Sequence, residues 1–272
     1  MAEAVVLGNR QWSLPGPEIG EMRDSTPLLR GDYGAELRER LASDGYCLFR
    51  SVLPVAVVNA ACQRITDEMA LGGWFADGTK PEERVQRFGG PRCGFAGNPN
   101  TAMLRAHECR AVTNDPKGAV LRCLEAPELH AIFDQLFEEP SVTMDYKWFR
   151  AVSPPSEAGQ IHGSFHCDKV YMGRGADQLT TAWIPFHSIE PADGGLAVLS
   201  GSSSLPGFET LRRTYAEHDV SATDIEPSAG GAYGSDPLEI LQQDPDARWV
   251  TTTYNGPPLL LLLLPCRTQV LT

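Results

Sequence analysis

Basic residues are scarce in this sequence. Its 272 residues include 23 Lys and Arg against 35 Asp and Glu, which gives a formal net charge of −12 at pH 7. A protein that binds nucleic acid neutralises phosphates with a basic surface, and attraction to an anionic membrane needs the same kind of charge. We therefore expect neither nucleic acid nor an anionic membrane surface among the partners.

Long hydrophobic runs are also missing. A helix that crosses a membrane needs about 20 consecutive apolar residues. The longest run here is the six leucines of Leu259 to Leu264, and prolines flank it on both sides. Residues 1–12 lack the cationic segment and long apolar stretch of a secretory signal. We expect no membrane span and an intracellular, cytoplasmic location.

Cysteines are few and scattered. There are seven, an odd number, and no two follow the C-x-x-C spacing of zinc clusters. A disulfide framework would need paired cysteines and an oxidising compartment. The pattern therefore indicates reduced thiols inside a cell.

Helical patterns lie in the first half of the chain and strand patterns in the second. This order predicts a mainly β jelly roll with an N-terminal helical layer, in one domain over residues 34–272. Residues 1–33 have no clear period and are predicted to form a loosely ordered extension. The predicted helices cover residues 36–41, 53–69, 117–125 and 127–137, and the predicted strands cover 46–50, 142–152, 179–186, 196–200, 249–254 and 259–264.

The densest group of polar residues lies between Gly159 and Asp168. Residues i and i+2 of a strand point to the same side, so His166 and Asp168 can offer a nitrogen and an oxygen to one point. Such a pair supplies two of the three ligands in the 2-His-1-carboxylate triad that binds iron(II). Cys167 lies between them and is expected to point away.

The surrounding sequence resembles the phytanoyl-CoA dioxygenase family. The resemblance implies a double-stranded β-helix of the cupin-like type and an oxygenase that uses iron(II), O2 and 2-oxoglutarate, with ascorbate as a further candidate cofactor. It implies hydroxylation of a small organic substrate and leaves that substrate and the oligomeric state open. The motifs that carry it are residues 147–155, the His-Cys-Asp run up to Gly175, the Thr-x-Trp strand of residues 181–186, and residues 190–203 with a Gly-Gly-Leu strand ending in Ser-Gly-Ser.

The resemblance also implies roles for single residues. His166 and Asp168 would bind the iron, and Trp183 would line the pocket for 2-oxoglutarate. Thr181 lies two residues before Trp183 in the same predicted strand. It should therefore face the same side.

The last residues depart from the family pattern. The family carries a second metal-binding His on a late strand and, beyond it, an Arg that binds the far carboxylate of 2-oxoglutarate. Here no His follows His218, and Gln269 or Val270 stands at about the place of the second His. The domain is therefore expected to be incomplete at its C-terminal end. His162 and His187 are the weak candidates for a replacement ligand.

Three interpretations of this departure remain open. The sequence is an altered or truncated end of an active enzyme, or an inactive relative that binds a ligand or partner, or another His completes the site. A sugar- or carboxylate-binding jelly roll that never held a metal is a further alternative.

Three more residues are candidates for the substrate or cosubstrate pocket. Arg150 follows an aromatic pair and could reach an acidic group, although a strand-edge Arg often pairs with a nearby carboxylate. Tyr171 and Arg174 follow the His-x-Asp pair closely and could cover the site from a loop. The alternative for both is an ordinary surface turn.

Overall fold

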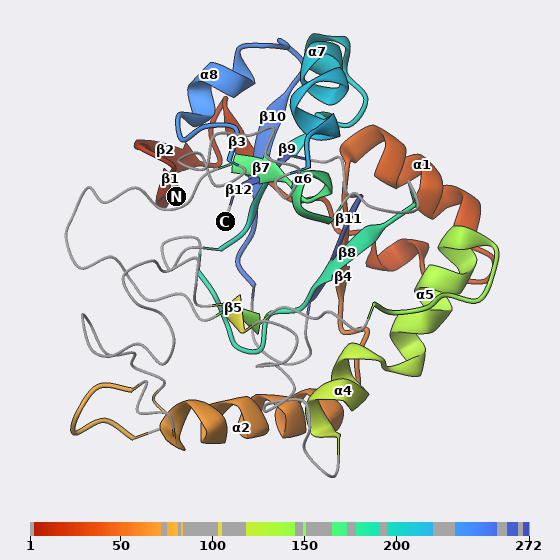
Figure 1. Cartoon of the computed structure of the whole chain (residues 1–272), viewed down its shortest axis with the longest axis vertical. Coiled ribbons are helices and arrows are strands. Elements are labelled where there is room, and N and C mark those ends of the chain that lie inside the picture. Colours follow the sequence, from red (N-terminus) through yellow and green to blue (C-terminus); the bar gives the residue numbers. More distant parts are fainter. Residues whose placement is uncertain are drawn as a thin grey trace.

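The computed structural model describes residues 3–71, 75–80, 83, 103–104, 118–144, 149–150, 165–172, 178–190, 195–219, 232–254, 260–265 and 269–271. Two sheets form its centre, and helices cover the outer faces of both (Figure 1). The longer helices are α1 (Gly34–Asp44), α2 (Val55–Leu71), α4 (Ala119–Leu124) and α5 (Pro127–Phe137).

The helical layer forms because each helix has one apolar stripe. Leu37 and Leu41 lie one turn apart on α1, and both are buried. The helix ends at Gly45, whose positive φ of 79° is a conformation that glycine adopts without strain and whose N–H bonds the carbonyl of Leu41. These leucines pack in one cluster with residues of α2, α4 and α5 and with Phe49, so the layer is attached to the smaller sheet.

The smaller sheet has the strand order β4-β11-β8 and is antiparallel throughout. The larger sheet has the order β3-β10-β9-β12-β7, with β3 parallel to β10 and the other pairs antiparallel. The strands are β3 (Ile19–Glu21), β4 (Cys47–Arg50), β7 (Phe165–Cys167), β8 (Thr180–Trp183), β9 (Ala197–Ser200), β10 (Arg248–Thr251), β11 (Leu260–Pro265) and β12 (Gln269–Leu271), while β5 (Met103–Leu104) and β6 (Phe149–Arg150) form a separate pair.

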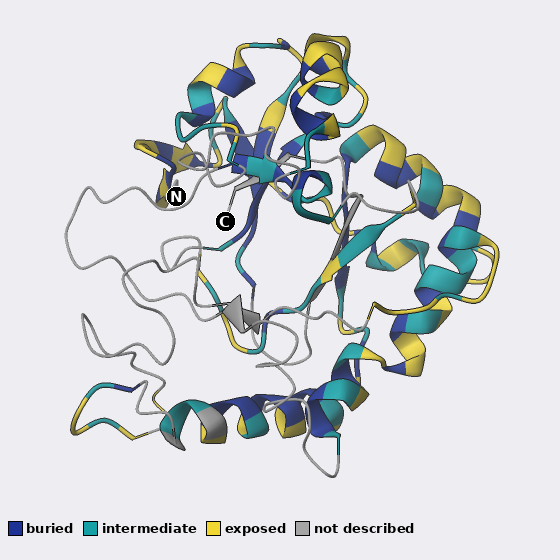
Figure 2. Ribbon diagram, viewed as in Figure 1, coloured by how far each residue is buried: buried dark blue, intermediate teal, exposed yellow. Residues whose placement is uncertain are grey.

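Side chains alternate between the two faces of these strands. Leu48 packs in the cluster between the sheets, whereas its neighbour Phe49 packs against the helices. In the larger sheet, Val198 faces the same inner cluster, and Leu199 faces the opposite side. Figure 2 shows that β4, β9 and β10 are largely buried.

Short helices cover the outer face of the larger sheet. They are α6 (Lys169–Met172), η5 (Pro206–Phe208), α7 (Glu209–Arg213), η6 (Tyr215–Glu217) and α8 (Pro237–Leu241); η1 (Thr26–Leu28) lies elsewhere, beside β4. Leu211 and Ile240 are buried in one cluster with the fully buried Trp249 of β10. The indole of Trp249 also donates a 3.0 Å hydrogen bond to the carbonyl of Pro237, which joins α8 to the sheet.

The N-terminal segment is packed into this outer layer, which differs from the loosely ordered extension expected for residues 1–33. β1 (Glu3–Leu7) and β2 (Arg10–Leu14) form a hairpin with buried side chains at alternate positions. Their apolar sides join the cluster around Trp249. Gly8 in the turn has a φ of 58°, and a Cβ there would lie 2.4 Å from the carbonyl oxygen of Ser235. The cause of the difference is burial of about four apolar side chains, which offsets the ordering cost.

The predicted helices and strands can be compared directly with these elements. Of the strand predicted over residues 142–152, the described residues 142–144 form no regular element, and β6 at 149–150 is a strand. The other predicted helices and strands that fall on described residues overlap observed ones. The specific arrangement as a double-stranded β-helix stays a prediction.

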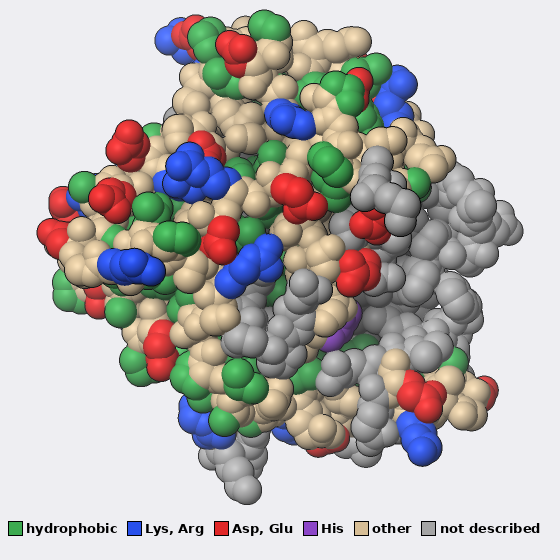
Figure 3. Space-filling model, turned by 180° about the vertical axis from the view of Figure 1, so that it is seen from behind, with side chains coloured by type: hydrophobic (Ala, Val, Ile, Leu, Met, Phe, Trp, Pro, Cys, Tyr) green, Lys and Arg blue, Asp and Glu red, His purple; other side chains and the backbone are tan. Residues whose placement is uncertain are grey.

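Three further observations concern membrane spans, surface charge and the cysteines. No helix of the described residues is long and apolar enough to cross a membrane. Figure 3 shows Lys and Arg side chains interspersed with Asp and Glu on the face seen from behind. The described cysteines form no disulfide, and burial raises the pKa of both Cys47 and Cys123 to about 12, so these groups remain thiols at neutral pH.

Candidate metal centre

The candidate centre begins on β7, whose two faces differ in chemistry. Phe165 and Cys167 are buried in the cluster on the outer side of the larger sheet. His166 alternates with them, and its side chain keeps 12% of its exposure; Asp168, just after the strand, keeps 19%. Strand alternation thus sends the imidazole and the carboxylate away from the apolar cluster, as expected from the sequence, and leaves both reachable from solvent.

His166 and Asp168 meet on that side. The Nε2 atom of His166 lies 3.6 Å from Oδ1 of Asp168. The other carboxylate oxygen, Oδ2, accepts a 2.6 Å hydrogen bond from the hydroxyl of Thr181 on β8. Because β8 belongs to the smaller sheet, this bond connects the edges of the two sheets. It also fixes the orientation of the carboxylate.

This donor pair can be tested against the needs of a divalent metal ion. Ligand atoms about 2.1 Å from one ion are at most about 4.2 Å apart, so a separation of 3.6 Å fits two ligands of a single ion. A hydrogen-bonded carboxylate beside an imidazole is a common arrangement around such ions. Over the described residues, however, no three His, Cys, Asp or Glu side chains are grouped as metal ligands. The described residues therefore offer two candidate ligands, His166 and Asp168.

Two other predicted pocket residues lie beside aromatic partners. Tyr171 of α6 contacts the ring of His166 edge-on, with 5.3 Å between the ring centroids. Trp183 of β8 contacts Tyr254 in the same way at 4.8 Å and packs against the cluster between the sheets. Tyr171 thus limits the movement of the imidazole. Trp183 is half-buried on the inner side of the smaller sheet.

The remaining candidates have other contacts or cannot be placed. His187 is exposed, and its Nδ1 lies 2.6 Å from the carbonyl oxygen of Ser188. Arg150 is in β6, where its backbone pairs with Met103. His162 and Arg174 fall outside the described residues. The structure therefore brings together His166, Asp168, Thr181 and Tyr171.

The strand beside β7 is β12. In the antiparallel register, Val270 faces His166 and Gln269 faces Cys167. The position directly opposite the first candidate ligand is thus occupied by a residue type that has no metal-binding atom.

One contact of the site was not anticipated from the sequence. Lys169, next to Asp168, forms a 2.5 Å ion pair with Glu217 of η6, and the Lys169 side chain is only 12% exposed. This pair attaches α6, and with it Tyr171, to the outer layer. Tyr215, also in η6, is packed behind β7, where burial raises its pKa and keeps the phenol protonated. The sequence signal was only a Lys beside the His-x-Asp motif, and its partner is 48 residues away.

A half-buried imidazole and carboxylate that approach one point are two candidate metal ligands, and a family comparison shows the class of protein that carries them. A family model described as phytanoyl-CoA dioxygenase (PhyH) matches residues 41–251, more than three quarters of the chain. The chain therefore belongs to the phytanoyl-CoA dioxygenase family, as its sequence motifs predicted. Members of this family have a cupin-like jelly-roll fold and are in general iron(II)- and 2-oxoglutarate-dependent oxygenases.

The range of the match is informative for the site. It includes His166, Asp168, Thr181 and Trp183 and stops before β11 and β12. A search of the curated proteins found no match.

Proposed function

We propose that this chain is an iron(II)- and 2-oxoglutarate-dependent oxygenase that hydroxylates a small organic molecule with O2. One observation carries the proposal: His166 and Asp168 approach one point, and Thr181 holds the second carboxylate oxygen. Family membership supports the same chemistry. The substrate is not specified by these residues, because fold and metal ligands are shared by oxygenases with different substrates.

Each residue has a defined part in this proposal. His166 and Asp168 would hold the iron, and the iron with 2-oxoglutarate would supply the oxidising chemistry when bound. Thr181 donates to Asp168 and thereby orients its carboxylate. Tyr171 restrains the imidazole ring. Trp183 forms an apolar wall on β8, the strand that carries Thr181. Ascorbate could act as a reductant that keeps the metal in its iron(II) state.

A second candidate function is a non-catalytic ligand-binding protein on the same scaffold. The observation that favours it is the pairing of Val270 with His166, together with the two-ligand set of the described residues. Two protein ligands hold a metal ion less tightly than three. This candidate predicts binding of 2-oxoglutarate or a related acid without turnover.

An anaerobic titration with manganese(II) or iron(II), with and without 2-oxoglutarate, tests the proposal. We expect binding tighter than millimolar and, in air, succinate formation coupled to loss of 2-oxoglutarate. His166→Ala and Asp168→Ala should each weaken metal binding by about a hundredfold or more, because they remove a ligand rather than a supporting residue. His187→Ala is the matched control and should leave it unchanged.

The outcomes separate the two candidates. Metal binding no tighter than millimolar would exclude the oxygenase for this chain. Binding of metal and 2-oxoglutarate without succinate release would support the non-catalytic candidate. Unchanged affinity in Asp168→Ala would show that the ligand assignment is wrong.

A gain-of-ligand variant sharpens the test. Residues that face each other in an antiparallel pair have Cβ atoms about 4.5–5.5 Å apart, so Val270→His would introduce an imidazole close to His166. We expect metal affinity to rise by about tenfold or more. The control is Gln269→His, one residue earlier and opposite Cys167, which should have no effect. Equal affinities for both variants would show that position 270 does not face the metal.

A further inference from the structure

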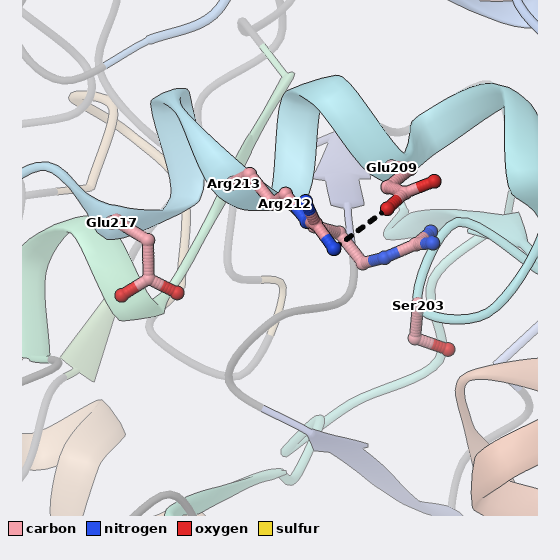
Figure 4. Close-up of a pocket in the computed structure, with 5 residues that line it drawn as sticks. All are labelled: Ser203, Glu209, Arg212, Arg213 and Glu217. Atoms are coloured by element: carbon pink, nitrogen blue, oxygen red, sulfur yellow. Dashed lines mark ion pairs between the residues drawn. The ribbon is translucent and has the colours of Figure 1, made fainter.

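A second polar site lies outside the candidate metal centre, on the layer of short helices. It is an open pocket of about 670 Å³ that is lined by Ser203, Glu209, Arg212, Arg213 and Glu217 (Figure 4). α7 and η6 supply four of these residues, and the turn after β9 supplies Ser203. None of them is His166, Asp168, Thr181 or Tyr171, although Glu217 pairs with Lys169, the residue after Asp168.

The acidic residues of the pocket are already paired. Glu209 forms a 2.9 Å ion pair with Nη2 of Arg213, which lies one turn later on α7. Glu217 forms the 2.5 Å ion pair with Lys169 that is described above. Both carboxylates therefore have cationic partners, so neither needs a bound cation to balance its charge.

The donors of the pocket are only partly used. Nη1 of Arg212 donates to the carbonyl oxygens of Ser202 and Leu205 at 3.1 and 2.8 Å, which fixes the guanidinium in place. Its Nε and Nη2 groups have no hydrogen-bond or ion-pair partner among the described residues. Figure 4 shows the Arg212 side chain extending from α7 toward the side of the pocket where Ser203 lies.

The hydroxyl of Ser203 adds a second unused group. Its Oγ atom is buried and has no hydrogen-bond partner among the described residues. A buried polar atom without a partner costs about 1–3 kcal/mol, and a bound ligand that supplies the partner recovers that cost. Ser203 lines the pocket, so rotation about its χ1 angle would turn the hydroxyl out of its buried position to donate to an anion beside the guanidinium.

We infer that this pocket binds a small oxoanion, a phosphate or carboxylate group, between the open edge of Arg212 and the hydroxyl of Ser203. The planar guanidinium matches the spacing of two oxygens of such a group, and charge-assisted hydrogen bonds of this kind are the strong ones. Arg212 needs no reorganisation, since two carbonyls already hold it. The inference is independent of the proposed function because it uses none of the metal-centre residues.

Titration with inorganic phosphate, and separately with acetate, tests the inference and distinguishes the two kinds of oxoanion. Chemical shifts or a rise in melting temperature would report saturable binding at constant ionic strength. Ser203→Ala should weaken it about tenfold, the effect of one lost hydrogen bond to an anion. Arg212→Lys should weaken it about tenfold or more. His166→Ala should leave it unchanged.

A charge variant gives an effect of opposite sign. Glu209→Gln removes a negative charge from the rim and frees Arg213, so phosphate should bind about twofold to threefold more tightly. Glu128→Gln on α5 makes the same change of net charge in the helical layer and should have no effect. The inference fails if neither anion binds saturably. It fails equally if Ser203→Ala and Glu209→Gln both bind like the unaltered chain, an outcome that does not depend on how well Arg212→Lys folds.

Discussion

The two faces of β7 differ sharply in burial and chemistry. On one face, Phe165 and Cys167 are buried among aromatic rings, with Phe165 at 6.2 Å from Trp249 and 5.8 Å from Tyr233 between ring centroids. On the other face, His166 and Asp168 keep part of their exposure and contact Thr181 and Tyr171.

Over the four residues from Phe165 to Asp168, the residues that stabilise the fold are thus separate from those proposed for chemistry. The apolar face contributes burial, which scales with the area removed from water. The polar face contributes orientation, because a ligand must be held at a fixed position while remaining accessible. Substitutions on the two faces should therefore change different measured quantities.

The largest effect is expected on the buried face. Phe165→Ala should lower the free energy of unfolding by about 3–5 kcal/mol, because it leaves a cavity against Trp249 and Tyr233. Urea denaturation followed by tryptophan fluorescence measures this. His166→Ala should change the same quantity by less than about 1 kcal/mol. A large loss in both variants would show that the two faces are not separate in function. Val142→Ala, at a side chain that is 90% exposed, is the control.

The next effect is expected on the polar face. Thr181→Val keeps the shape of the side chain but removes the hydroxyl that binds Asp168. Metal affinity should fall by about tenfold, the lower end of the range for groups that support a metal ligand. Thr180→Val is the matched control, since its hydroxyl bonds the carbonyl of Gln178 instead. Isothermal titration with manganese(II) would compare the two, and an equal loss in both would contradict the role given to Thr181.

The smallest effect concerns the segment that covers the buried face. Residues 233–236 run beside Phe165, whose N–H and carbonyl bond Gly234 and Tyr233. Asp236 then pairs with Arg10, and this hydrogen-bonded ion pair lowers the pKa of the carboxyl from 3.8 to about 2. A lowered carboxyl pKa means that its stabilisation is complete above about pH 4 and disappears as the pH falls toward 2.

Asp236→Asn tests this assignment. The melting temperature of the unaltered chain should fall more steeply between pH 4 and pH 2 than that of the variant. The difference should be small, because the pair is partly exposed and screened by water. Parallel slopes would show that the pair does not contribute to acid sensitivity.

The sequence predicted which residues around β7 share a side, because alternation along a strand is a local property. His166 and Asp168 share a side by strand parity, and Thr181 shares a side with Trp183 by the same rule. The hydrogen bond between Thr181 and Asp168 joins two sheets, so no spacing rule could give its existence. The Lys169 and Glu217 pair and the pocket at Arg212 depend in the same way on how distant segments pack.

The N-terminal segment shows a signal that was present but weak. Buried Val5 and Leu7 alternate with exposed neighbours, and Gly8 with Asn9 forms a two-residue turn between β1 and β2. Such a pattern indicates a hairpin. It was outweighed by the charged and Gly- and Pro-rich residues around it, and its packing partners lie more than 150 residues further along the chain. Local sequence could not supply those partners.

The parallel pairing of β3 with β10 has a consequence for synthesis on the ribosome. Ile19 faces Trp249, so the strand that closes this edge of the larger sheet meets its partner only after 230 further residues have been added. Synthesis adds about 5–20 residues per second, so roughly 10–50 s pass between synthesis of β3 and synthesis of its partner β10. During that interval the apolar residues of the first 20 positions are exposed, so chaperone binding to the nascent chain should be strongest there and should end when β10 emerges.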